Sequence, residues 1–261
     1  MQTSEIPEAS APPDIAALYA DMRRCMRVPV VNLIYRTLAT MDGALPWVWA
    51  ALRPAALSGA LDASAKRLTD AVPRIELGSM TAPEADRAGI MHVVEGYNRG
   101  NSLNLVGLIA VKRLLQPPHA PARPAPAAPA PDSAPPPLPR ILKLSELQPD
   151  VARKVEAIAA LHGTGGIVPS IYLHLAHWPQ SLLAVCERIA PHVADGSVAR
   201  ACEAAVAVAR TETDRLLPSL GAPGAPPSAH AAQMDQAIDL YTSRLIPQLL
   251  PVGLSLATAL R

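Results

Sequence analysis

The sequence predicts an all-α protein, and three features lead to this prediction. Half of its 261 residues are apolar, yet aromatic residues make up only 3% and phenylalanine is absent, so alanine, leucine, valine and isoleucine must build the core. Alanine and leucine favour helices, whereas runs of β-branched residues are scarce. The other two features are a segment that recurs in both halves of the chain and a proline-rich stretch between them.

The recurring segment aligns the two halves at a shift of 137 residues. VPVVNLIYRTLATM (28–41) contains IYRTLA, and GGIVPSIYLHLAHWP (165–179) contains IYLHLA. Nine residues are identical without a gap over 29 positions; in the first copy they are Val31, Ile34, Tyr35, Leu38, Ala39, Leu45, Val48, Pro54 and Gly59. We therefore expect two tandem helical repeats, packed as a pseudo-dimer about an approximate two-fold axis, with a pocket between them.

The proline-rich stretch, residues 116–140, holds 11 of the 29 prolines of the chain. Such a segment cannot propagate a helix or pair in a sheet, and is expected to form a semi-rigid tether. A ligand role for its PxxP motifs is the alternative. The tether interpretation gives a first helical repeat over 1–115, a linker over 116–140 and a second helical repeat over 141–261.

The remaining elements follow the same two-fold pattern. Two alanine-rich stretches, 62–72 and 197–217, predict matching helices. Each half is expected to close on an apolar helix, around Gly107 or Gly253. Thr81–Glu84 has capping-box spacing with an early proline, which predicts a helix start at this tetrapeptide.

Charge and cysteine content exclude several classes of function. The chain has 23 basic and 22 acidic residues, a formal charge of +1 and no long charge run, so nucleic acid is not an expected partner. Three widely spaced cysteines without a CxxC motif exclude a thioredoxin-type pair or a zinc knuckle. We expect them to be buried thiols in a reducing compartment.

The sequence also argues against a membrane protein. The N-terminal residues lack the basic and apolar regions of a secretory signal. The longest charge-free apolar run, 245–260, is shorter than the ~18–20 residues that span a bilayer, and it contains two prolines. We expect it to be a buried core helix, and the protein to be soluble and cytoplasmic, without a membrane partner; a homodimer is compatible with the sequence.

Three motifs resemble the group I 2-haloacid dehalogenases. They are RVPVVNLIYRTLATMDGALPWVW (27–49), GYNRGNSLNL (96–105) and VPSIYLHLAHWP (168–179), and the resemblance covers nearly the whole chain outside residues 116–140. It implies an all-α fold in which two related repeats surround one active site. It also implies cofactor-independent hydrolysis of the carbon–halogen bond of short 2-halocarboxylic acids, of either enantiomer, by a directly activated water and without a covalent ester intermediate.

The resemblance assigns roles to individual residues. Asn101 matches the asparagine that holds the attacking water, and Ser170 matches the serine beside the catalytic aspartate. The aspartate itself, expected directly after that serine, is replaced by Ile171, and the aromatic wall of the first repeat is reduced to Val30 and Leu33. Isoleucine cannot accept a proton, and loss of a general base alone removes ~10²–10⁴ in rate.

His174 and Glu95 are the candidates for a non-standard base. If residues 170–187 form a helix, His174 lies one turn after Ile171 on the same face, and an imidazole there could reach a pocket water. A histidine packed between the repeats is the simpler interpretation, because no orienting carboxylate accompanies it. Glu95 and Tyr97 could also supply acid–base chemistry, although a solvated glutamate and a core or rim tyrosine are the more common situations.

Two further alternatives concern the same segments. His174 and His177 have a spacing that could suggest a metal pair, but two ligands fall short of the usual three or four, so we expect no metal and no cofactor. Asn98 and Asn101 in YNRGN could cap a helix break instead of holding water, since asparagine and glycine favour turns.

Two hypotheses about function follow. The first, which the Ile171 substitution favours, is a haloacid-dehalogenase-like protein that has lost or changed its hydrolytic activity and keeps a pocket for a short carboxylic acid. In this pocket Asn101, Ser170, Ile171, Val30, Leu33 and Tyr97 would contact the ligand. The second is an active hydrolase of 2-halocarboxylic acids that uses His174 or Glu95 as its base.

Overall fold

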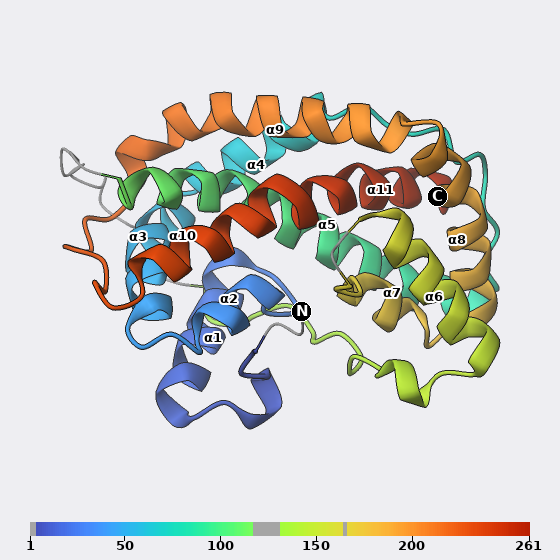
Figure 1. Cartoon of the computed structure of the whole chain (residues 1–261), viewed down its shortest axis with the longest axis horizontal. Coiled ribbons are helices and arrows are strands. Elements are labelled where there is room, and N and C mark those ends of the chain that lie inside the picture. Colours follow the sequence, from blue (N-terminus) through green and yellow to red (C-terminus); the bar gives the residue numbers. More distant parts are fainter. Residues whose placement is uncertain (1–3, 117–130, 164–165) are drawn as a thin grey trace.

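The computed structural model of the protein describes residues 4–116, 131–163 and 166–261. Its regular elements are helices, and these described residues contain no strand (Figure 1). The α-helices are α1 (Pro13–Met26), α2 (Leu33–Leu38), α3 (Ala44–Leu57), α4 (Ala60–Ala71), α5 (Glu84–Leu114), α6 (Pro149–Leu161), α7 (Ser170–Leu175), α8 (Pro179–Ala194), α9 (Ser197–Leu216), α10 (Ala231–Leu240) and α11 (Ile246–Ala259). Short 3-10 turns are η1 (Glu8–Ser10), η2 (Leu144–Glu146) and η3 (Leu217–Ser219), and η4 (Tyr241–Leu245) is a π-helical turn. The predicted all-α fold is confirmed.

Helices α5, α9 and α11 pack on one another as a central group, and α4 packs against α5 and α9. Helices α1–α3 and α10 lie at one end of this central group, and α6–α8 lie at the other (Figure 1). The fold therefore has two outer clusters that are joined by helices which run through both.

The hydrophobic core is divided in the same way. The first core combines α1–α4 and the C-terminal half of α5 with the C-terminal part of α9, α10, η4 and the N-terminal part of α11. The second core combines residues 75–82 and the N-terminal half of α5 with α6–α8, the start of α9 and the C-terminal end of α11. Each core thus takes side chains from both halves of the chain. This interleaving is compatible with the predicted pseudo-dimer of repeats, which stays a prediction together with its boundaries.

Corresponding segments of the two halves have similar local structure. Helices α2 and α7 each span six residues, and Gly59 and Gly196 precede α4 and α9 with a left-handed backbone conformation (φ 78° and 77°). The predicted alanine-rich helices are confirmed as α4 and α9. A single helix over 170–187 is wrong, because the chain turns after α7 and a new helix begins at Pro179.

Helix α5 runs without a break through the YNRGN segment. A helix break at Asn98 and Asn101 is therefore wrong, and tertiary packing outweighs the turn preference of these residues. The predicted start is confirmed, since α5 begins at Glu84, but Pro83 precedes it and no side-chain capping bond is present. Thr81 therefore does not cap the helix as expected.

Part of the predicted linker packs against the helices. Residues 117–130 lie outside the described part of the chain, whereas 131–140 have no regular secondary structure. In this segment the carbonyl oxygens of Pro136, Pro139 and Arg140 accept hydrogen bonds from side chains of α5, α7 and the turn after α7. The described end of the linker is therefore fixed to the protein, unlike a free tether.

The apolar run 245–260 forms α11, whose side chains are mostly buried, as predicted. Among the described residues, no helix combines the length and the apolar character that crossing a bilayer requires.

A close contact holds α5 against α11. The Asn98 side-chain amide donates to the Gly253 carbonyl oxygen at 2.9 Å, and a Cβ atom at residue 253 would overlap the Asn98 side-chain oxygen. With Asn98 in this position, residue 253 has no room for a side chain.

We predict that Gly253→Ala destabilises the protein, because the added methyl group displaces the buried Asn98 side chain that bonds α5 to α11. Overpacking of this kind costs about 1–3 kcal/mol, and this exceeds the gain in helix propensity. The free energy of unfolding in urea measures the effect.

Gly107→Ala is the matched control on α5. A Cβ atom there would lie 3.0 Å from a terminal methyl carbon of Leu52, which can move aside. We expect a change within about 1 kcal/mol of zero. Equal losses in the two variants would contradict the role of the Asn98–Gly253 contact.

Candidate functional site

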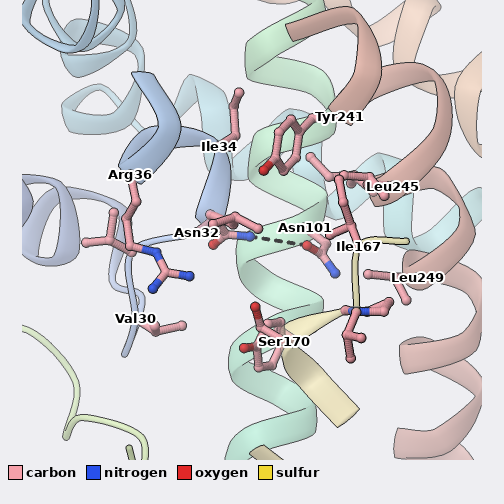
Figure 2. A pocket seen from close by; sticks show the side chains of 16 residues that line it. Val30, Asn32, Ile34, Arg36, Asn101, Ile167, Ser170, Tyr241, Leu245 and Leu249 are labelled. Atoms are coloured by element: carbon pink, nitrogen blue, oxygen red, sulfur yellow. Dashed lines mark hydrogen bonds between the residues drawn. The ribbon is translucent and has the colours of Figure 1, made fainter. Parts of the chain in front are cut away.

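A cavity of about 50 Å³ lies between the two halves of the chain. Its walls come from the segments that lead into α2 and α7, from the middle of α5, and from η4 with the start of α11 (Figure 2). Residues 30–33 and 167–170, which correspond at the 137-residue shift, line it from opposite sides. The repeated segment therefore supplies two walls of one cavity.

Two asparagines meet in the wall between α2 and α5. Asn32 immediately precedes α2, and its side-chain amide donates to the side-chain oxygen of Asn101 at 3.2 Å (Figure 2). Asn101 is only 4% exposed, and its own amide nitrogen points toward the side of the cavity where Ser170 lies. This bond fixes the orientation of Asn101 and leaves its NH₂ group as a donor toward the cavity.

Tyr97, one helical turn before Asn101, connects the cavity to a buried histidine. The carbonyl oxygen of Pro139 lies 2.8 Å from His174 Nε2 and can only accept, so Nε2 carries the proton. In the neutral imidazole Nδ1 is then an acceptor, and the Tyr97 hydroxyl donates a hydrogen bond to it at 2.7 Å. Burial lowers the pKa of His174 to about 4 and raises the pKa of Tyr97. At neutral pH both groups are therefore uncharged.

A second tyrosine occupies the opposite wall. Tyr241 lines the cavity from the π-helical turn η4, and its hydroxyl lies 3.4 Å from Thr37 Oγ1. Thr37 and His174 occupy matching positions in IYRTLA and IYLHLA. Each of these two positions therefore contacts a cavity tyrosine that belongs to the other half of the chain.

Arg36 is the only side chain with a formal charge among the residues that line the cavity, all of which lie in the described part of the chain. It is 7% exposed, and its Nη1 is 3.1 Å from a carboxylate oxygen of Glu5. Leu173 stands at the matching position of the second half. None of the lining residues is an aspartate, a glutamate or a histidine.

Five of the residues predicted to contact a ligand line the cavity. They are Val30, Leu33, Tyr97, Asn101 and Ser170. The sixth, Ile171, does not line it, because its side chain is 3% exposed and packs in the second core. At this point of the chain the serine faces the cavity and the isoleucine faces away from it.

The two predicted catalytic residues lie elsewhere. Glu95 is exposed on the outside of α5, where its carboxylate is 3.4 Å from Arg261. His174 lies behind Tyr97 and reaches the cavity only through the phenol, since both ring nitrogens have protein partners. His177 is bonded to the carbonyl of Arg140, so it does not pair with His174 around a metal ion.

Sequence reasoning missed Arg36, Asn32 and Tyr241. The signal for Arg36 was the difference between IYRTLA and IYLHLA, because an arginine replaces leucine in an otherwise apolar helix. Asn32 could have been found in the same comparison, because it is a polar residue at a position where the second copy has Pro169. No comparable signal marked Tyr241, which lies outside the aligned segment.

Comparison with known proteins gives a result at the level of structure. No protein-family model matches the sequence, and no curated protein matches it. A D-2-haloacid dehalogenase mutant solved with D-2-CPA superposes with a TM-score of 0.80 at 18% identity, covering 99% of this chain and 96% of that one. A D-2-haloacid dehalogenase with L-LA gives a TM-score of 0.78 at 17% identity, covering 100% and 97%. The chain has the fold of the D-2-haloacid dehalogenases.

A further mutant of this dehalogenase type gives a TM-score of 0.79 at 18% identity, with 100% of this chain and 96% of that one covered. The shared fold therefore covers nearly the whole length of each chain.

Among the described residues, no group of three or more histidine, cysteine, aspartate or glutamate side chains is placed to hold a metal ion.

We predict that the free energy of unfolding falls as the pH is lowered from about 6.5 to about 4. Burial lowers the pKa of His162, which contacts the Tyr172 hydroxyl, to about 4, as it does for His174. In the unfolded chain both imidazoles take up a proton as the pH falls below about 6.5. In the folded chain they stay neutral until the pH approaches about 4. Each histidine thus accounts for up to about 3 kcal/mol, present above pH 6.5 and lost toward pH 4. Urea titrations across this range measure the slope.

Replacing both buried histidines, His162 and His174, by glutamine should flatten this slope, whereas His230→Gln, outside the two cores, should not.

Asp21 titrates outside the same pH range. Burial raises the pKa of Asp21, but hydrogen bonds from Arg53 and Trp49 outweigh it and lower the pKa to about 2. The stability that the Asp21 carboxylate contributes is therefore lost only below about pH 4, the ordinary pKa of an aspartate. A double variant that keeps the wild-type slope between pH 4 and 6.5 would contradict the assignment.

Proposed function

We propose that this protein binds a short carboxylic acid in the cavity between its halves and is impaired in, or has diverged from, hydrolytic dehalogenation. The absence of a general base from the cavity lining carries this proposal. The dehalogenase fold supports a small organic acid as the class of ligand, because the structural neighbours are named for their action on 2-haloacids.

Hydrolytic dehalogenation requires that a water molecule lose a proton as it attacks the carbon that bears the halogen. The acceptor must lie within hydrogen-bond reach and hold the proton at the working pH. The polar side chains of Asn101, Ser170 and Tyr97 line the cavity, but they are neutral at pH 7 and are poor proton acceptors. These groups can orient a ligand or a water molecule, but none of them can activate water as a carboxylate does.

The hydrolase hypothesis depends on His174, and one observation favours it: the hydrogen bond from Tyr97 links this histidine to the cavity. For catalysis, Tyr97 would have to pass a proton to an imidazole whose pKa burial lowers to about 4. The phenolate left behind would then take the proton of water, but burial raises the pKa of Tyr97 and so opposes formation of the phenolate. Both shifts oppose the transfer, so binding without hydrolysis is the better supported function.

The cavity also limits the size of the ligand. A volume of about 50 Å³ accommodates a molecule of a few non-hydrogen atoms, since one water needs about 10–15 Å³ on this scale. Leu33, Leu245 and Leu249 supply apolar surface for a short alkyl chain. Propionate and 2-chloropropionate have the matching size and polarity.

We predict that D- and L-2-chloropropionate bind to the protein but release negligible halide. Isothermal titration calorimetry measures binding, and a halide assay beside an active 2-haloacid dehalogenase measures turnover. Asn101→Ala should weaken binding by roughly tenfold, because it removes a buried hydrogen-bonding amide.

Glu95→Gln is the control, because Glu95 lies outside the cavity and should leave binding unchanged. Halide release at the rate of the active dehalogenase would refute impaired dehalogenation. Should His174→Ala then abolish that release, the hydrolase hypothesis would replace the present proposal.

We further predict that Ser170→Asp introduces halide release above the wild-type background, because it places a carboxylate on the cavity wall that Asn101 faces. Ile171→Asp is the matched control one residue further along. Its carboxyl group would enter the second core, so we expect a loss of several kcal/mol in stability and no halide release. A folded, ligand-binding Ser170→Asp variant without any release would argue that more than the base is missing.

A further inference from the structure

The burial of Arg36 requires an explanation, because a charged side chain at 7% exposure is costly unless it is fully paired. Its guanidinium group carries five N–H donors. Glu5 is its salt-bridge partner, and that glutamate side chain is itself 33% exposed. Among the described residues, no acceptor lies within hydrogen-bond distance of the buried Arg36 Nε. The salt bridge to Glu5 engages Nη1, which is only part of the guanidinium group, and Arg36 lines the cavity.

Arg36 also acts electrostatically on the cavity. Figure 2 shows its guanidinium group extended from α2 toward the space between Val30 and Asn32. Burial is the main reason for the raised pKa of Tyr97 and the lowered pKa of His174, and the positive charge of Arg36 lowers the pKa of both groups. Arg36 therefore makes the cavity attractive to anions.

The N-terminal segment holds the counter-ion in place. The backbone amide of Ile6 donates to the Arg36 carbonyl oxygen at 3.1 Å, and the Tyr19 hydroxyl donates to the Ile6 carbonyl oxygen at 2.9 Å. These bonds fix the chain directly after Glu5 to α2 and α1. Glu5 thus approaches Arg36 from the N-terminal segment and not from the cavity, since it is not among the lining residues.

We propose that Arg36 binds the carboxylate group of the ligand, and that Glu5 is a competing counter-ion that sets the strength of this binding. The inference rests on the proposed function, which it deepens by assigning the residue that recognises the acid. An arginine fork matches the two oxygens of a carboxylate, and such charge-assisted bonds are stronger than those between neutral groups. Asn101 and Ser170 then face the remainder of a small molecule whose charge is held at Arg36.

This assignment gives the asymmetry of the repeat a function. IYRTLA and IYLHLA differ at two positions, Arg36 against Leu173 and Thr37 against His174. Leu173 is not among the lining residues, whereas Arg36 is. The cavity therefore has a charged side chain on the α2 side only, which orients a carboxylate in one direction.

Calorimetry with propionate and with its neutral isostere propionamide tests the proposal on the full chain. We expect the wild type to prefer propionate, and Arg36→Gln to weaken propionate binding roughly 10- to 100-fold while the affinity for propionamide is unchanged. A variant that had merely lost its fold would lose both ligands. Arg36→Lys, which keeps the charge but not the fork, should restore part of the preference.

Glu5→Gln tests the counter-ion. Removing this partly exposed competitor should tighten propionate binding by up to roughly fivefold. Glu76→Gln, at an exposed glutamate that does not line the cavity, makes the same change in net charge and should have no effect. Equal affinities in the two variants would overturn the role of Glu5.

The outcomes separate this inference from the proposed function. If Arg36→Gln binds propionate as tightly as the wild type, the arginine is not the anchor, while carboxylate binding stands. If neither the wild type nor Glu5→Gln binds propionate, both the anchor and the proposed function are overturned. Loss of the propionate preference in Arg36→Gln, with propionamide binding retained, establishes the anchor.

Discussion

The close approach of α5 and α11 is the contact on which the rest of the structure depends. Asn98 bonds directly to the backbone of Gly253, and a side chain at that residue would prevent it. Both cores share these two helices, and the cavity takes Tyr97 and Asn101 from one and Leu249 from the other. The spacing of the two helices therefore determines the packing of both cores and the width of the cavity.

Composition and the repeated segment account for most of what could be predicted from the sequence. The all-α fold followed from the composition, and the helices α4 and α9 followed from two alanine-rich stretches. The walls formed by 30–33 and 167–170 lie where the alignment places equivalent positions. Such agreement is expected where periodicity and composition act over many residues.

Individual cavity residues were harder to predict because each helical residue turns by about 100°. Ser170 and Ile171 are neighbours in sequence, yet one faces the cavity and the other the second core. Glu95 precedes Tyr97 by two residues and lies on the outside of α5, whereas Asn101, one turn after Tyr97, shares its face. Only the rotation of each helix in the packed structure decides such cases.

The interleaved cores have a consequence for the synthesis of the protein. The first core joins the helices of the first hundred residues to side chains between Ala205 and Leu254. During translation, those early apolar faces remain without their partners until most of the chain has left the ribosome. Contacts across such sequence distances form slowly, and exposed apolar surface favours aggregation in the interval. The interleaving that surrounds one cavity with both halves of the chain thus also delays the burial of the apolar surface made first.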